Sequence, residues 1–250
     1  MIPAAHRPGK TAAHVIDRHP ARRTVCEATR ETAVPTSTKQ DYERMTSEEY
    51  ADMRALLEGL TDEQWDAPSL CEGWRVRHVI GHICLGLQTS PATLPARLVR
   101  FGFNIAKASS VMSYRYGEEH TPAELRADFT RLTTTPGKPG LAKMIPAKEF
   151  FADKLIHNQD IRRPLDLPRS IPTDHLVAAL DALPSIGGFL KSKGNAASLR
   201  LVATDVDHTV GSGPEVRGPA EAIILAVSGR PVALPELAGD GVDTLRARIA

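Results

Sequence analysis

An aspartate and a histidine four positions apart, Asp153 and His157, form the strongest chemical signal in the sequence. Residues at this spacing on a helix lie on the same face, so a single metal ion could be bound by both side chains. His78 and His82 repeat the spacing, and Asp160 extends the polar stripe of the first pair by one turn. A polar stripe within an otherwise apolar helix needs a partner, and a metal ion is one candidate.

Imidazole nitrogen and carboxylate oxygen suit divalent ions such as Zn²⁺, Fe²⁺, Ni²⁺ and Mn²⁺. Three protein ligands with one open position are the usual arrangement of a catalytic metal site. The alternative is that these side chains are solvated or hydrogen-bonded residues, since pairs at this spacing also arise by chance. Spacing alone therefore leaves metal binding as a hypothesis.

Helical periodicity predicts the elements that position these residues. A first helix is expected to begin at Thr46, where a hydroxyl precedes two glutamates, and Thr121 begins another with a proline and a glutamate in its first turn. The last of these helices cannot continue past Pro164. The expected helices cover residues 46–59, 74–88, 121–132 and 147–163, with a less regular, partly helical region over 91–120.

The pattern changes beyond Pro168. A short helix over 174–183 is followed by a strand-like run over 198–204, which can turn into a return strand through residues 209 and 210. A further helix over 220–229 would pack on this hairpin as an α+β layer. We therefore predict an α+β fold in which a helical part precedes a small part with a sheet.

The segment before the first helix differs from the rest of the chain. Residues 1–44 are rich in Arg, His, Thr, Ala and Pro and show no periodicity. We expect them to be disordered, or a mis-assigned extension if translation starts at Met45; a transit peptide is an alternative, although serine is scarce. The predicted parts are 1–44, a helical bundle over 45–168 and an α+β domain over 169–250.

Composition excludes several classes of protein. With 31 basic and 30 acidic residues the net charge is +1, which argues against nucleic-acid binding. The sequence has no run of about 18 apolar residues, which a membrane-spanning helix would need, and no apolar stretch typical of a secretory signal. Cys26, Cys71 and Cys84 form no CxxC pair, which favours a reducing, cytoplasmic location. We expect Cys71 to be a packing residue and Cys84 to face away from His82.

Three segments resemble the mycothiol-dependent maleylpyruvate isomerase family. Residues 60–83 (LTDEQWDAPSLCEGWRVRHVIGHI) resemble its opening signature. Residues 153–163 (DKLIHNQDIRR) are similar to a second landmark, an acid four positions before a histidine that an aspartate follows. Residues 203–205 (ATD), and 211–220 (GSGPEVRGPA) through the glycine and arginine at 229–230, resemble the core of the family's C-terminal domain.

This resemblance implies a DinB-like four-helix bundle followed by a small α+β domain. It also implies a metal in the bundle, held by one histidine of the second helix and by an acid and a histidine of the last. His82, Asp153 and His157 match those positions. The family usually has glutamate where Asp153 stands, so the shorter side chain could bind through water. It usually has aspartate where His78 stands, and His78 is either a fourth ligand or the partner of another side chain.

The residues around the site have expected roles as well. Asp160 is expected to pair with Arg162, Arg163 or a backbone group, and it could orient His157 as a hydrogen-bond acceptor. Arg230 matches an arginine of the family that could grip a carboxylate of substrate or cofactor, and its alternative role is that of a cation at a helix C-terminus. Trp65 and Trp74 are expected to be core anchors, or an aromatic wall of the cleft.

The function that the resemblance implies is that of a metal-dependent and mycothiol-dependent enzyme, with Zn²⁺ as the first choice of metal. Mycothiol would occupy the open position as a thiolate, because a Lewis-acidic metal lowers the pKa of a bound thiol. The enzyme would be an isomerase or a thiol transferase acting on a small electrophile. The alternative is a non-catalytic, metal-stabilised bundle whose C-terminal domain binds an apolar ligand or a protein partner.

Overall fold

The computed structural model describes residues 37–250 except 136, 138, 188 and 189, and these residues belong to one compact unit. Most of the segment expected to be disordered, 1–44, lies outside the described residues. The helix start expected at Thr46 is wrong, because α1 (Lys39–Gly59) begins earlier. Thr38 caps it by accepting a hydrogen bond from the N–H of Asp41. Tyr42 and Met45 are buried, so the apolar face already exists before Thr46.

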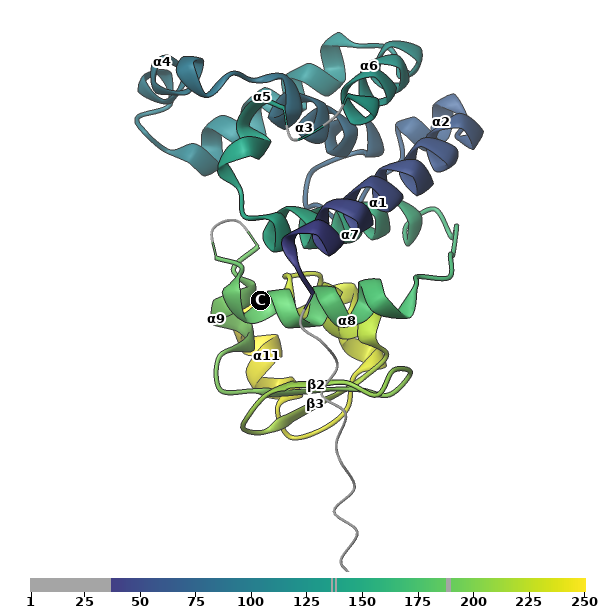
Figure 1. Cartoon of the computed structure of the whole chain (residues 1–250), viewed down its shortest axis with the longest axis vertical. Coiled ribbons are helices and arrows are strands. Elements are labelled where there is room, and N and C mark those ends of the chain that lie inside the picture. Colours follow the sequence, from purple (N-terminus) through teal and green to yellow (C-terminus); the bar gives the residue numbers. More distant parts are fainter. Residues whose placement is uncertain (1–36, 136, 138, 188–189) are drawn as a thin grey trace, which may run out of the picture. The chain divides into compact units, whose positions relative to one another are not determined.

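Most of the described chain is helical, and a small sheet lies in its C-terminal part (Figure 1). The fold is therefore α+β, as expected. None of the described helices is long and apolar enough to cross a membrane. After α1 the helical part contains α2 (Asp62–Trp65), α3 (Val76–Gln88), η1 (Pro91–Thr93), α4 (Leu94–Arg100), α5 (Ile105–Glu119), α6 (Pro122–Thr134), η2 (Gly140–Met144) and α7 (Ala147–Arg162).

The C-terminal part is built on a three-stranded sheet of order β2-β1-β3. The predicted hairpin is confirmed, because β1 and β2 pair antiparallel with Leu201 opposite Val210. The strand β3 pairs parallel to β1 and was not predicted, because Val216 is the only large apolar residue in it. The elements here are α8 (Thr173–Ala182), η3 (Leu183–Ser185), α9 (Ser192–Ala196), β1 (Arg200–Ala203), β2 (Thr209–Gly211), β3 (Glu215–Gly218), α10 (Ala220–Val227), η4 (Pro231–Glu236) and α11 (Val242–Ile249).

The helix α7 is buried between two hydrophobic cores. Phe150 and Ile161 pack into the core that α1, α3 and α6 form. Phe151, Leu155 and Ile156 pack into the core shared with α8 and α10. A helix that is covered on both sides has no broad solvated face, so the polar side chains on it need partners inside the protein. The polar stripe that the sequence indicated on this helix therefore lies within the fold.

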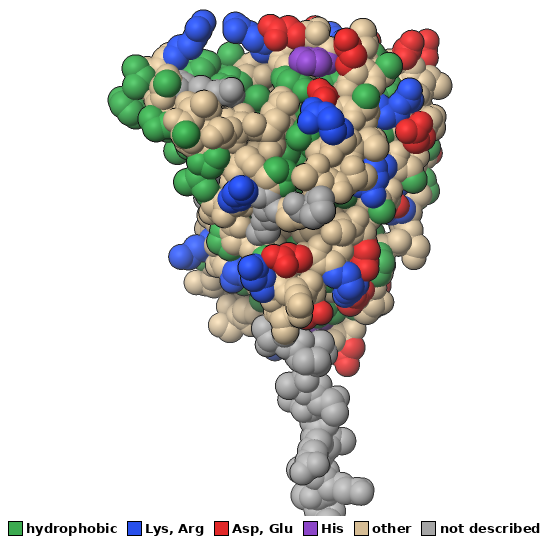
Figure 2. All heavy atoms as spheres, turned by 45° about the horizontal axis from the view of Figure 1, so that its top comes forward, with side chains coloured by type: hydrophobic (Ala, Val, Ile, Leu, Met, Phe, Trp, Pro, Cys, Tyr) green, Lys and Arg blue, Asp and Glu red, His purple; other side chains and the backbone are tan. Residues whose placement is uncertain are grey.

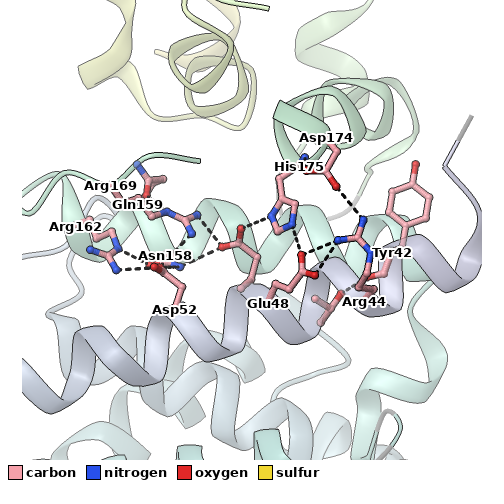
Figure 3. A network of polar contacts seen from close by, with 12 residues as sticks. Tyr42, Arg44, Glu48, Asp52, Asn158, Gln159, Arg162, Arg169, Asp174 and His175 are labelled. Atoms are coloured by element: carbon pink, nitrogen blue, oxygen red, sulfur yellow. Dashed lines mark hydrogen bonds and ion pairs between the residues drawn. The ribbon is translucent and has the colours of Figure 1, made fainter. Parts of the chain in front are cut away.

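Charged residues connect α1, α7 and α8 in a network (Figure 3). The carboxylate of Glu49, which is 1% exposed, accepts hydrogen bonds from Asn158 Nδ2 at 3.1 Å and Arg169 Nη2 at 2.7 Å. His175 lies between two carboxylates, with Nδ1 2.8 Å from Glu49 and Nε2 2.8 Å from Glu48. Burial would lower the pKa of His175, but hydrogen bonds to Glu49 and Glu48 raise it above its ordinary value.

We expect His175 to stabilise the fold less as pH rises. Its folded pKa is raised above the unfolded value of about 6.5. The contribution is therefore fully present below that unfolded value and is lost as pH rises through the folded one. Urea unfolding of the wild type and His175→Gln should show the wild type more stable at about pH 6, with a smaller difference at about pH 9. A difference that does not change with pH would contradict this assignment of charge.

Candidate metal centre

Helices α3 and α7 bring His82, Asp153 and His157 together. The rings of His82 and His157 meet edge to face with centroids 5.2 Å apart. Asp153 Oδ1 lies 3.4 Å from Nε2 of His157. One possible ligand atom from each of the three residues lies within 4.8 Å of the others. Two atoms bound to one ion at about 2.0–2.2 Å lie at most about 4.4 Å apart, so these atoms are close to the separation that a shared ion requires. The three residues predicted from sequence are thus gathered, and their binding of a metal stays a prediction.

Hydrogen bonds fix the orientation of both imidazoles. Nδ1 of His157 lies 2.9 Å from Oδ2 of Asp160, and this nitrogen carries the proton because a carboxylate can only accept. Nδ1 of His82 lies 3.2 Å from the hydroxyl of Ser113 and 3.5 Å from that of Ser109. Nδ1 is therefore engaged in both rings, which leaves Nε2 for a metal. Metal-binding histidines commonly have their other nitrogen held in this way.

Burial and neighbouring charges set the protonation of the cluster. Burial, and then the charge of His157, lower the pKa of His82 to about 3, so this ring is neutral, as a ligand must be. Burial would raise the pKa of Asp153, but Lys154 and His157 hold it well below its usual range. Burial would lower the pKa of His157, but Asp153 and Asp160 raise it well above the ordinary value. A metal bound here would therefore displace a proton from His157.

Asp160 joins this cluster to the C-terminal part of the chain. Arg230 donates to both of its carboxylate oxygens, from Nε at 2.8 Å and from Nη2 at 2.6 Å. The Nη1 atom of Arg230 donates to the carbonyl oxygen of Ser228 at 2.5 Å. The contact expected between Asp160 and His157 is present, but the cation that pairs with Asp160 is Arg230 and not a neighbouring arginine. The orienting role of Asp160 stays a prediction. In this arrangement Arg230 holds Asp160 in place, and its gripping of a substrate carboxylate stays a proposal.

Lys154 shares the carboxylate that a metal would need. Its Nζ lies 2.5 Å from Oδ2 of Asp153 and 4.6 Å from the centre of the Phe150 ring. The lysine side chain is 6% exposed, so water screens this charge poorly. The ammonium group both occupies one carboxylate oxygen and repels a cation. Lys154 should therefore weaken metal binding.

Replacing Lys154 by methionine is expected to raise the affinity for a divalent ion about tenfold, because one like charge is removed from the immediate surroundings of the ion. Competition with a chromophoric chelator would measure the change. Lys143→Met removes the same charge from an exposed position and should change the affinity by less than about twofold. Equal affinities of Lys154→Met and the wild type would show that Lys154 does not compete for Asp153.

A cavity of about 580 Å³ lies beside the cluster. His82, Asp153 and Lys154 are among the residues that line it, and apolar side chains such as Leu98 and Met112 line much of the rest. Cavities of roughly 300–1,000 Å³ with an apolar lining and a few convergent polar groups are typical of small-molecule sites. Two of the three candidate ligands, His82 and Asp153, therefore face a space in which a small molecule could approach a bound metal.

His78 lies outside the cluster. Its Nδ1 accepts the backbone N–H of Arg75 at 3.0 Å, so Nε2 carries the proton and donates to Glu118 at 2.8 Å. Burial lowers the pKa of His78, which agrees with a neutral ring. Of the two roles considered for His78, the structure supports that of a partner for other groups: it caps the start of α3 and links it to α5.

The two cysteines of the described residues have thiols that stay protonated at neutral pH. Sγ of Cys71 donates to Asp160 at 3.1 Å, and burial raises its pKa above the ordinary value. Cys71, His157 and Asp160 form a second group of possible ligands, but Asp160 already binds Arg230 through both oxygens. Cys84 is fully buried, and burial raises its pKa to about 12. Cys26 lies outside the described residues.

The two tryptophans have different environments. Trp65 is 1% exposed and packs in the core of the helical part, as expected of an anchor. Trp74 is partly buried, and its ring centre lies 5.5 Å from that of His82. Trp74 therefore lies beside one of the candidate ligands, and it also packs against the core of the helical part.

The N-terminal half of the described chain matches a known sequence family. Residues 46–135 match the model described as "Mycothiol maleylpyruvate isomerase N-terminal domain". These residues are therefore similar to that domain. The matched range includes His82 and ends before Asp153 and His157, so the fold, and not the family match, brings the last two residues to it.

Two solved structures have a fold similar to that of this chain. One is a mycothiol-dependent maleylpyruvate isomerase, at 16% identity and a TM-score of 0.53. The other is a variant of mycothiol-dependent maleylpyruvate isomerase in which a histidine is replaced by alanine, at 15% identity and the same TM-score. Each match covers 83% of this chain and 96% of the other. No curated protein matches this chain.

Two features near the candidate metal centre were not predicted from the sequence. Ser113 and Ser109 hold His82 although they come from α5, in the region that showed little regularity. Nothing in the sequence distinguishes Lys154 from a solvent-exposed lysine, and only the packing of α7 shows that it is buried. The glycines Gly81 and Gly117 could have indicated that α3 and α5 pack closely. A Cβ on Gly81 would lie 3.0 Å from the Ser113 carbonyl oxygen.

Proposed function

We propose that this chain is a metal-dependent, mycothiol-dependent isomerase or thiol transferase that acts on a small electrophile. The observation that supports it best is that the three candidate ligands lie together and that two of them, His82 and Asp153, line a cavity. A metal held for folding alone is usually closed by four protein ligands, whereas three ligands and a neighbouring cavity suit a catalytic centre. The match to the isomerase N-terminal domain agrees with this function.

In the proposed function each residue of the cluster would have a different role. His82 and His157 would hold the metal through Nε2, and Asp153 would supply a carboxylate oxygen. A Lewis-acidic ion such as Zn²⁺ would lower the pKa of a thiol bound beside these residues, so that the thiol is a nucleophile at neutral pH. Asp160 keeps the His157 ring in the required tautomer, and Arg230 keeps Asp160 in place. The aliphatic cavity would exclude water from the reacting groups.

A cobalt-substituted protein tests this proposal. Mycothiol added to the Co²⁺ form is expected to produce a sulfur-to-cobalt charge-transfer band that saturates at about one thiol per chain, because the open position accepts a thiolate. S-methylated mycothiol cannot form a thiolate and should leave the spectrum unchanged. Stoichiometric Co²⁺ binding with no change at any thiol concentration would favour the alternative, a closed structural site.

A further inference from the structure

We propose that the cavity takes an electrophile with an apolar body, an alkyl or aryl group, and with no more than one carboxylate. This inference rests on the proposed function, because it names the substrate class of the same site. It follows from three features of the cavity: its aliphatic lining, its charges and the residues at its mouth.

Much of the cavity lining is apolar and comes from several helices. Leu87 of α3, Leu94 and Leu98 of α4 and Met112 of α5 line it, and Ile186 adds a buried side chain from the C-terminal part. Burying the apolar part of a ligand against these side chains is favourable, whereas a polar group of the ligand would find no hydrogen-bond partner on them. A ligand of matching volume would therefore place hydrocarbon against this lining.

The charges that line the cavity do not suit a dianion. They are Glu149, Asp153 and Lys154, and the described lining residues include no arginine. Lys154 already lies 2.5 Å from the carboxylate of Asp153. Two carboxylates on a ligand would lose their hydration next to two protein carboxylates and one shared cation, which is unfavourable. A single carboxylate could lie at the end of the cavity where Lys154 and a bound metal supply positive charge.

The mouth of the cavity is also apolar. Ile105 and Ile145 line the cavity and are 53% and 39% exposed. Val99 and Phe103, in the neighbouring segment of α4 and its following turn, are 64% and 71% exposed. Hydrophobic side chains gather on the upper left of the face in Figure 2, on the side where Figure 1 places α4. Exposed apolar patches beside a cavity commonly mark a site of ligand entry.

Displacement of a neutral fluorescent probe, N-phenyl-1-naphthylamine, tests this inference in metal-free and thiol-free protein. The probe is expected to bind saturably to the wild type. Octanoate should displace it at a concentration at least about tenfold lower than maleate, because octanoate has a hydrocarbon body and one carboxylate. Absence of saturable binding to the folded wild type, or displacement by maleate as effective as by octanoate, would overturn the inference.

Two neighbouring residues of α5 provide a matched pair of variants. Met112→Trp would fill the cavity and should weaken probe binding at least about tenfold. Val111→Trp adds the same side chain at an exposed position and should change binding by less than about twofold. If Met112→Trp does not fold, the competition between octanoate and maleate on the wild type still tests the inference.

The two proposals can fail separately. Probe binding by a protein whose Co²⁺ form does not respond to mycothiol would reject the proposed enzymatic function and support an apolar binding site. A response to mycothiol without probe binding would reject only the proposed substrate class.

Discussion

Asp160→Asn is expected to lower the free energy of unfolding by about 3–5 kcal/mol, because it leaves the guanidinium of Arg230 buried without a counter-charge. Arg230 is 8% exposed and donates to both oxygens of Asp160. Urea unfolding would measure the loss. Asp243→Asn is the control: its ion pair with Arg246 is exposed, so the change should stay below about 1 kcal/mol.

A second measurement on the same residue separates positioning from stability. Asp160→Asn should also weaken metal binding by about 10–100-fold, because His157 loses the carboxylate that fixes its ring. The double variant Asp160→Leu/Arg230→Met removes both charges and should recover most of the stability. Its metal affinity should remain low. Recovery of both properties in the double variant would mean that Asp160 has no orienting role.

Removing the metal is expected to destabilise the wild type strongly. An ion that binds only the folded state adds roughly 4 kcal/mol when its free concentration is about 1,000 times its Kd. A chelator should therefore lower the melting temperature of the metal-loaded wild type by several degrees. Calorimetry with free chelator and with chelator already saturated by Zn²⁺ would separate metal removal from other effects of the reagent.

The same scan on His157→Ala provides the contrast. This variant lacks a candidate ligand from the centre of the cluster, so its melting temperature should not respond to chelator. A response as large as that of the wild type would place the stabilising ion elsewhere. No response in the metal-loaded wild type would mean that the metal contributes nothing to the folded state.

Much of the helical framework could be predicted from sequence, because periodicity and capping report local structure. The structure confirms a helix ending near the predicted residue 163, since α7 spans Ala147–Arg162 before Pro164. The start of α1 was missed because composition suggested disorder before Thr46, although Tyr42 and Met45 continue the apolar face. The strand β3 was missed because it is short and Val216 is its only large apolar residue. The helix α11 (Val242–Ile249) was also missed, although Val242, Leu245 and Ile249 follow helical spacing, because an element of eight residues gives a weak signal.

The candidate site could be predicted in its parts but not in its connections. The spacing of Asp153 and His157 showed that they share a face, and the family resemblance added His82. No local pattern could show that Arg230 would reach Asp160, because that contact joins residues 70 positions apart. Nor could a local pattern show that the Lys154 ammonium would be buried against the Asp153 carboxylate in the lining of a cavity. That burial depends on the packing of α7 between two cores.

Metal content of the purified protein tests the central claim most directly, namely that His82, Asp153 and His157 bind one divalent ion. Elemental analysis should find about one ion per chain in the wild type. The ion should be nearly absent from His82→Ala and from His157→Ala, and retained in His208→Ala, whose histidine pairs with Asp181 outside the cluster. Unchanged metal content in both His82→Ala and His157→Ala would contradict the account.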